Sequence, residues 1–223
     1  MRNTAARALG AWHTDDVYEG LLQALRTRRS SGLIETLGEF ERREAVPDLV
    51  TALQDDFCRS AAEEALSKIG EAAHSTLIEA ARTPDPSGTA ESAQSRSRRR
   101  CALRLLRRLR LLPEDWQKLA ALLRDSDAEI AARTASIALA AADEPDQKLA
   151  ARRLIEVLPA ADWLVQGEIQ SWLEEHFDIA QVSINEEIER RRAVAAAGQS
   201  KDDILRLLLA IKSKVRRLPP DAR

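Results

Sequence analysis

A run of arginines is the part of this sequence best suited to bind a charged ligand. The segment RSRRRCALRLLRRLR carries eight arginines between Arg96 and Arg110. On a helix, one face would hold the candidate anion-binding residues Arg100, Arg104, Arg107 and Arg108. The opposite, apolar face would hold Cys101, Ala102, Leu105, Leu106, Leu109 and Leu112, with Leu103 and Leu111 outside it. The ligand would be nucleic acid, an acidic protein or a lipid headgroup.

A second interpretation of the arginine run is a solvated helix face, neutralised in part by acidic neighbours. The sequence favours this second interpretation for two reasons. Thirty-four Lys and Arg stand against 36 Asp and Glu, so the formal charge is −2 and the chain as a whole is not basic. No aromatic residue lies among the arginines, although stacking on aromatic rings is usual in sites for single-stranded nucleic acid.

Other residues that could do chemistry are too scattered to form a predicted site. His13, His74 and His176 have no His or Cys at metal-ligand spacing, and we interpret His74 and His176 as surface or helix-end residues. Pairs of carboxylates are expected to cap helices rather than act as acid and base, namely Asp15-Asp16, Asp55-Asp56, Glu174-Glu175 and Asp202-Asp203. The sequence has no Gly-rich phosphate loop and no GxSxG motif. We therefore predict no catalytic residue, no metal and no cofactor.

Composition indicates a globular cytoplasmic protein. The chain has 223 residues, of which 44% are hydrophobic and 31% charged, enough to build a core. Cys58 and Cys101 are too few for a disulfide framework and are predicted to be small core residues in a reducing compartment. No apolar run reaches the roughly 20 residues that span a bilayer, and the first residues lack the apolar block of a signal peptide.

A repeated pattern predicts the architecture. The segments LLQAL (21–25), LVTAL (49–53) and LIEAA (77–81) follow one another at intervals of 28 residues. Each is preceded by a helical segment that ends in an apolar residue and a glycine, at Gly10, Gly38 and Gly70, and glycine in the left-handed conformation commonly closes a helix. Each unit is therefore predicted to be a helix, a tight turn and a second helix. Such hairpins bury their apolar faces by stacking, so the predicted fold class is an all-α solenoid.

The repeat continues less regularly after residue 83. LAALL (119–123) and LIEVL (154–158) stand where second helices are expected. The segment 84–97 is rich in Pro, Gly and Ser and is predicted to be an inserted flexible loop. This gives four predicted parts: regular repeats over 1–83, the loop over 84–97, degenerate repeats over 98–180 and C-terminal capping helices over 181–223.

Local signals predict several helix boundaries in the later repeats. Ser126, Ser183 and Ser200 each precede an acidic residue by three positions, which is the spacing of a capping box. Pro113 and Pro145 suit the first turn of a helix. The last helix is predicted over 201–218 and should cover the end of the stack with the apolar stripe Ile204, Leu208, Ile211, Val215 and Leu218.

Two of these segments resemble HEAT repeats, in particular the short bacterial type found in phycobilisome lyase subunits. They are SGLIETLGEFERREAVPDLVTALQDD and RSAAEEALSKIGEAAHSTLIEAARTPD. The resemblance covers residues 2–83 well and 98–180 loosely. It implies a ladder of Asp and Arg between repeats, for which Asp55, Asp56 and Arg59 are candidates, as are Asp125, Asp127 and Arg133. HEAT proteins are mostly binding scaffolds, so the resemblance implies a fold more specifically than a function.

The second helices should expose corresponding residues in parallel rows, which is where solenoids usually hold a partner. The rows have mixed polarity, which favours a protein partner over DNA. Trp163 lies at a predicted helix start and is a candidate exposed anchor, whereas Trp172 is predicted to be core. The predicted partner-binding residues are Arg26, Thr51, Gln54, Glu79, Arg82, Lys118, Arg124 and Trp163.

Three function classes remain open. The first is a non-catalytic scaffold or adaptor that binds a protein. The second is a nucleic-acid-binding protein that uses the arginines of 96–110, including the short HEAT-like DNA glycosylases, whose basic channel and catalytic Asp we cannot match in this sequence. The third is an accessory subunit of a tetrapyrrole lyase, which rests on the repeat type alone.

The N-terminal edge is a further predicted contact. RNTAARAL (2–9) aligns with RSAAEEAL (59–66), so the chain begins almost at a first helix and lacks a polar unit to cover it. Solenoids need such end units. We therefore expect the face of Ala5, Ala8 and Leu9 to contact another copy, a partner protein or a missing upstream segment.

Overall fold

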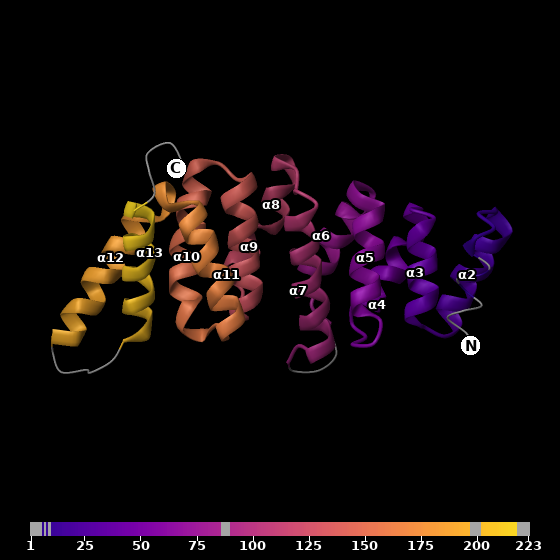
Figure 1. Ribbon diagram of the computed structural model, residues 1–223, viewed down its shortest axis with the longest axis horizontal. Helices are drawn as coiled ribbons and strands as arrows, with labels where there is room; N and C mark the ends of the chain where they lie inside the picture. The colour runs from indigo at the N-terminus through magenta and orange to yellow at the C-terminus, as the bar shows by residue number, and fades with distance from the viewer. Residues whose placement is uncertain (1–5, 7, 9, 86–89, 197–201, 218–223) are drawn as a thin grey trace. The chain divides into compact units, whose positions relative to one another are not determined.

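The computed structural model describes residues 6, 8, 10–85, 90–196 and 202–217, and the elements within these ranges are all helical (Figure 1). They fall into two units, Met1–Leu111 and Leu112–Arg223. Each unit is a stack of antiparallel helical hairpins, which confirms the predicted all-α solenoid class.

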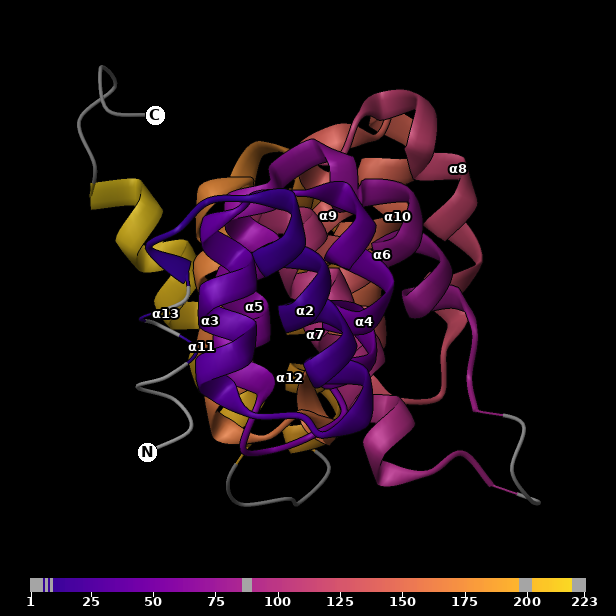
Figure 2. The same ribbon diagram turned by 90° about the vertical axis from the view of Figure 1, so that its right-hand side faces the viewer.

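Unit 1 contains α2 (Asp15–Thr27), α3 (Ser31–Glu39), α4 (Val46–Ala52), α5 (Arg59–Ile69), α6 (His74–Arg82) and α7 (Ala93–Arg108). Two short 3-10 turns, η1 (Arg43–Ala45) and η2 (Gly70–Ala73), lead into α4 and α6. The first helices α3 and α5 pack on one another, and the second helices α2 and α4 lie on the other side of the stack (Figure 2). Helix α6 packs on both α4 and α7.

Unit 2 contains η3 (Pro113–Asp115), α8 (Trp116–Leu119), η4 (Ala120–Arg124), α9 (Ala128–Ala141), α10 (Glu144–Val157), η5 (Leu158–Ala160), α11 (Trp163–Glu175), α12 (Phe177–Ala196) and α13 (Asp203–Arg217). Helices α9 and α10 form one hairpin, and α11 and α12 form the next. Helix α11 packs between α9 and α13 in the first-helix layer, while α10 packs on α12 in the second-helix layer.

The repeated Leu-x-x-x-Leu pattern is the core of every second helix. Its first positions are buried in five repeats, at Leu21, Leu49, Leu77, Leu119 and Leu154. Its last positions are buried too, at Leu25, Leu53, Ala81, Leu123 and Leu158. A sixth copy, INEEI, lies on α12 with Ile184 and Ile188 buried. Residues four apart on a helix share a face, so this pattern sets the side that each second helix turns toward its hairpin partner.

The glycines before the second helices do not share one role. Gly70 has a positive φ of 71° after α5, as predicted for a residue that closes a helix. Gly10 and Gly38 are helical, so the prediction is wrong for both. A Cβ added to Gly38 would lie 2.8 Å from Ala65 Cβ and 2.9 Å from Ala65 Cα. Gly38 therefore allows α3 and α5 to approach closely.

The segment 84–97 is not entirely a loop. Helix α7 begins at Ala93, inside the predicted insertion, with the Ser92 hydroxyl accepting from the Ser95 N–H as its cap. Ser95 is buried and donates from its hydroxyl to Glu91 at 2.6 Å. Arg99, also buried, donates to Glu91 at 2.8 Å. Ser95 and Glu91 thus tie this segment to the rest of unit 1, although Ala90, Ala93 and Gln94 are exposed, and residues 86–89 lie outside the described part.

The capping residues differ from those predicted. Helix α9 is capped by Asp127, whose carboxylate accepts from Glu129 and Ile130, so Ser126 is not the cap. Ser183 lies in the interior of α12 and caps nothing. Ser200 lies outside the described residues. The prolines do occupy first helical turns, Pro113 in η3 and Pro145 in α10.

Arginines hold the ends of several second helices through main-chain carbonyls. The side-chain Nε–H groups of Arg59, Arg99 and Arg153 donate to Leu53 O, Ala81 O and Leu123 O, at 3.1, 2.8 and 2.7 Å. These carbonyls belong to the last turns of α4, α6 and η4, where no further helical N–H is available. Arg59 also pairs with Asp56, as the HEAT resemblance implied.

Helix α13 covers α11 and α12 as predicted for the last helix. Leu208, Ile211 and Val215 are buried, Ile204 is half-buried, and Leu218 lies outside the described residues. Beside these apolar contacts, Arg191 of α12 forms an ion pair at 2.8 Å with Asp202, the residue just before α13. The C-terminal helix is therefore anchored at its first turn and along one face.

Candidate functional site

The arginines of α7 are partly used by unit 1 itself. Arg104 pairs with Glu63 at 3.4 Å, and Arg100 and Arg107 are half-buried and take part in further interactions. Of the predicted anion-binding set, Arg104 and Arg108 are exposed. Arg98 and Arg99, which the prediction did not include, donate to Thr83 O and Ala81 O. The run therefore fixes the end of α6 as well as presenting charge to solvent.

The apolar face of α7 is wider than predicted. Leu103 is fully buried although it falls outside the stripe drawn from the sequence. After the helix, Leu111 is buried and Leu112 is exposed, the reverse of the prediction. The positive φ of Arg110, 58°, turns the chain at this point, so a helical register no longer applies to the two leucines.

The predicted partner-binding residues of unit 1 lie on its second helices. Arg26 of α2 reaches Asp48 of α4 at 3.0 Å, and Glu79 and Arg82 of α6 pair at 3.6 Å. Thr51 and Gln54 are half-buried at the end of α4. These side chains present mixed charge, as the sequence pattern indicated.

In unit 2 the predicted residues are more dispersed. Lys118 on α8 pairs with Asp115, and Arg124 is exposed at the end of η4. Trp163 is 82% exposed, but it begins α11, which belongs to the first-helix layer. Trp163 therefore does not extend the row of second-helix residues. Trp172 is buried on the same helix, as predicted.

The histidines give no ligand set. His74 is the first residue of α6, so it lies at a helix end as predicted, but it is buried and not at the surface, and its Nε2 atom has no hydrogen-bond partner. His13 is exposed with its ring 4.9 Å from that of Phe40, and His176 follows the last turn of α11. Among the described residues, no three His, Cys, Asp or Glu side chains are grouped closely enough to hold a metal ion.

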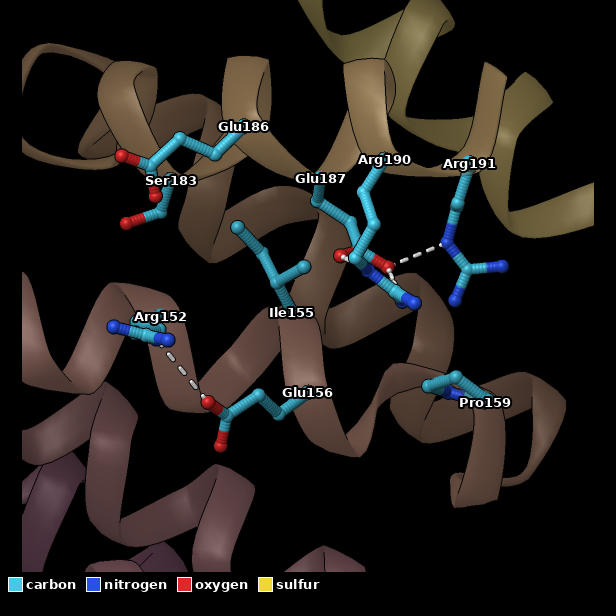
Figure 3. Close-up of a pocket in the computed structure, with 9 residues that line it drawn as sticks. All are labelled: Arg152, Ile155, Glu156, Pro159, Ser183, Glu186, Glu187, Arg190 and Arg191. Carbon is cyan, nitrogen blue, oxygen red and sulfur yellow. Dashed lines mark hydrogen bonds and ion pairs between the residues drawn. The ribbon is translucent and has the colours of Figure 1, made fainter. Parts of the chain in front are cut away.

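A polar groove lies between α10 and α12 in unit 2 (Figure 3). It encloses about 380 Å³ and lies between two second helices, the surface on which the sequence predicts a partner. Buried Ile155 contributes to its base. Its lining residues are Arg152, Ile155, Glu156, Pro159, Ser183, Glu186, Glu187, Arg190 and Arg191.

Each wall of the groove carries its own ion pairs. On α10, Glu156 forms an ion pair with Arg152 at 3.3 Å and accepts a hydrogen bond from Arg153 at 3.2 Å. On α12, Glu187 accepts from Arg190 and from Arg191, both at 2.6 Å. Figure 3 shows the Glu156 carboxylate directed toward Arg152, and Glu187 together with Arg190 and Arg191 on the other side of the groove. Both walls thus present positive and negative side chains.

The electrostatics of the α12 wall are set by these arginines. The hydrogen bond from Arg190 lowers the pKa of Glu187, against the opposing effect of partial burial. Burial alone would raise the pKa of Asp202, but bonds from the Leu205 N–H and from Arg191 outweigh it and lower that pKa. Both carboxylates are therefore ionised at neutral pH and hold Arg191 between them.

The lining of the groove combines paired charged side chains with one hydroxyl. Ser183 supplies the hydroxyl group among the lining residues. These residues include no histidine that could accept a proton from it. In unit 1, burial and the neighbouring Glu63 raise the pKa of the Cys101 thiol to about 12, which keeps it protonated and unreactive. Cys58 is buried as well, so both cysteines are core residues as predicted.

Sequence reasoning missed the groove, although the repeat register contains the signal. The predicted partner-binding residues Thr51 and Glu79 lie two positions after the first leucine of their repeats. Gln54 and Arg82 lie three positions further along. The same count from Leu154 gives Glu156 and Pro159, both of which line the groove. Extending the rows to the LIEVL repeat would have found one wall.

We expect the Glu187→Gln variant to lose about 1 kcal/mol of unfolding free energy at pH 7, because two arginines lose a charged acceptor. A lowered folded-state pKa stabilises the protein above the unfolded pKa of a glutamate, and this contribution is lost as the pH falls through the folded value. The difference in unfolding free energy between the variant and wild type should therefore become smaller below about pH 4. Urea titrations at several pH values measure it, and a constant difference would contradict the assignment.

Comparisons with known proteins leave the family open. No protein-family model matches the chain, and no curated protein matches it. Among solved structures, it is similar to the complex of CpcE and CpcF of phycocyanin lyase from Nostoc sp. PCC7120. The identity is 16%, the TM-score is 0.44, and the match covers 96% of this chain and 88% of that one. Within the described residues, no helix is long and apolar enough to cross a membrane.

Proposed function

We propose that this chain is a non-catalytic scaffold of HEAT-like hairpins that binds a protein partner on its second helices. The observation that carries the proposal is the groove between α10 and α12, where ion-paired arginines and glutamates stand over an apolar base. Mixed charge around a nonpolar centre is typical of protein interfaces, whose rims are polar and whose specificity comes from charge complementarity.

The groove favours a protein over nucleic acid. Its guanidinium groups are matched by Glu156, Glu186 and Glu187, whereas a phosphate-binding surface needs an excess of positive charge. A protein segment can present both signs at once. The nucleic-acid alternative, based on Arg100, Arg104, Arg107 and Arg108, and the tetrapyrrole lyase subunit alternative both stay predictions from the sequence.

Affinity capture from nuclease-treated native extract tests the scaffold. We expect wild-type protein to recover a protein that the Arg152→Glu/Arg190→Glu variant does not, whether a different protein or an untagged copy of this chain. A matched control, Arg108→Glu, changes an exposed arginine of unit 1 and should leave capture unchanged. Identical recovery by wild type and the groove variant would contradict the proposal.

The same protein preparations separate the alternatives. Binding of labelled duplex or single-stranded nucleic acid, weakened steeply by salt and lost when the four arginines become glutamine, would support the nucleic-acid function instead. A change in the visible absorption of an added linear tetrapyrrole would support the lyase subunit. For the scaffold we expect neither response.

A further inference from the structure

Helix α12 exposes a row of side chains at intervals of four residues beside the groove. The row consists of Val182, Glu186, Arg190 and Val194. All four are exposed, the two valines to 64% and 46%. Residues four apart form a continuous ridge on a helix surface, and such ridges are the elements by which helices pack on one another.

This ridge is self-complementary when its direction is reversed. Glu186 and Arg190 stand two residues before and two residues after Ile188, and Val182 and Val194 stand six residues before and six after it. Suppose that a second copy of α12 lies antiparallel on this ridge, with the centre of the contact at the level of Ile188. Arg190 of the second copy would then face Glu186 of the first, and Val194 of the second would face Val182 of the first. Opposite charges then meet at the centre, and apolar side chains meet at both ends.

The α10 wall of the groove repeats this arrangement. Among the exposed side chains of α10 and of η5, which follows it, one row consists of Leu149, Arg152, Glu156 and Pro159, and Leu149 is 49% exposed. Arg152 and Glu156 lie two residues before and two after Leu154, and Leu149 and Pro159 lie five residues before and five after it. Reversal pairs Arg152 with Glu156 and Leu149 with Pro159. Both walls therefore have unlike charges at the centre and apolar residues at the ends.

We propose that the groove face of unit 2, defined by the exposed rows of α10 and α12, is the contact for a second copy of this chain. The two copies would be related by a two-fold axis, because a two-fold contact brings the same surface of both copies together in reverse. This inference rests on the proposed function and names the partner of the same site.

The charges and the apolar residues would contribute differently. Arg190 has 64% of its side chain exposed and can share its guanidinium between Glu187 of its own copy and Glu186 of the other. Exposed ion pairs add little affinity but fix the register, because any shift brings like charges together. Burial of Val182 and Val194 supplies the nonpolar area.

Sedimentation velocity of the purified full chain over a range of concentrations provides the test. We expect wild type to form a dimer that weakens with added salt. The single variants Glu186→Arg and Arg190→Glu each place like charges at two symmetry-related contacts, so the dissociation constant should rise at least about tenfold. The double variant Glu186→Arg/Arg190→Glu restores unlike pairs with the signs exchanged and should dimerise again.

An equimolar mixture of the two single variants is the most specific measurement. One has arginine at both positions and the other glutamate at both, so each repels itself but complements the other. A heterodimer in the mixture, with monomers in each separate sample, is expected. The off-ridge variant Glu189→Arg/Arg192→Glu, at an exposed ion pair of the same helix, should dimerise as wild type does.

Wild type that stays monomeric up to about 0.5 mM would overturn the proposal, as would single variants that dimerise as tightly as wild type. Circular dichroism melts confirm that each variant is folded. If the chain is monomeric but capture from extract still depends on Arg152 and Arg190, the scaffold function survives and only the self-pairing fails. If neither dimer nor groove-dependent capture is found, both fail.

Discussion

We expect the Arg99→Met variant to lose about 3 kcal/mol of unfolding free energy. Arg99 is 3% exposed, and its guanidinium donates to Ala81 O and to Glu91, both at 2.8 Å. Methionine fills a similar volume but removes both bonds. The Glu91 carboxylate, itself largely buried, would then lack this cation, and the last turn of α6 would lose a donor to its carbonyl.

Urea denaturation followed by far-ultraviolet circular dichroism at neutral pH measures this loss. The matched control is Arg108→Met, which changes an exposed arginine of the same helix and should shift stability by less than about 0.5 kcal/mol. Equal midpoints for Arg99→Met and the control would show that the buried pair is not what anchors this segment.

The same contacts change the expectation for residues 84–97. From sequence, deleting most of this segment should leave the thermal midpoint almost unchanged, as for a surface loop. Because Ser95 is buried and Glu91 holds Arg99, we now expect that deletion to lower the midpoint. Deleting an exposed residue of this segment alone, such as Ala90, should lower the midpoint less.

The start of α7 could not be predicted from the sequence because its stability comes from tertiary contacts. Residues 90–97 contain no large apolar side chain, so no helical period is visible there. The helix begins with a serine cap and is held by Arg99, which reaches back to α6. A buried arginine is indistinguishable from its exposed neighbours in a run of arginines.

The second helices, by contrast, were predictable because one physical requirement recurs in each of them. Leucine or a similar residue at both ends of a four-residue interval must be buried for the hairpins to stack, and the pattern survives in the irregular repeats. The same register locates Glu156 and Pro159 of the groove. Predicting the α12 wall would have required recognising INEEI as a further copy of the repeat. This is harder because isoleucines stand where the other copies have leucines.

The N-terminal edge is less fully described. Ala8 is exposed, while Ala5 and Leu9 lie outside the described residues, so the contact expected there stays a prediction.

The second large effect is expected at Gly38, where alanine should destabilise the protein by about 2 kcal/mol. In an ordinary helix interior the change from glycine to alanine is favourable by about 1 kcal/mol, because glycine has the greater freedom in the unfolded chain. Here the new methyl group would meet the main chain of Ala65 at 2.9 Å, a distance that forces α3 and α5 apart. The cost of repacking two helices should exceed the gain.

Gly20→Ala provides the matched control, because Gly20 lies within α2 and a Cβ there meets nothing within 4 Å. The two variants make the same chemical change, so they should move the urea midpoint in opposite directions, Gly20→Ala upward by an amount equivalent to about 1 kcal/mol. A Gly38→Ala protein that is as stable as wild type would show that the helices can separate without cost. The close approach of α3 and α5 would then not be the reason for glycine at this position.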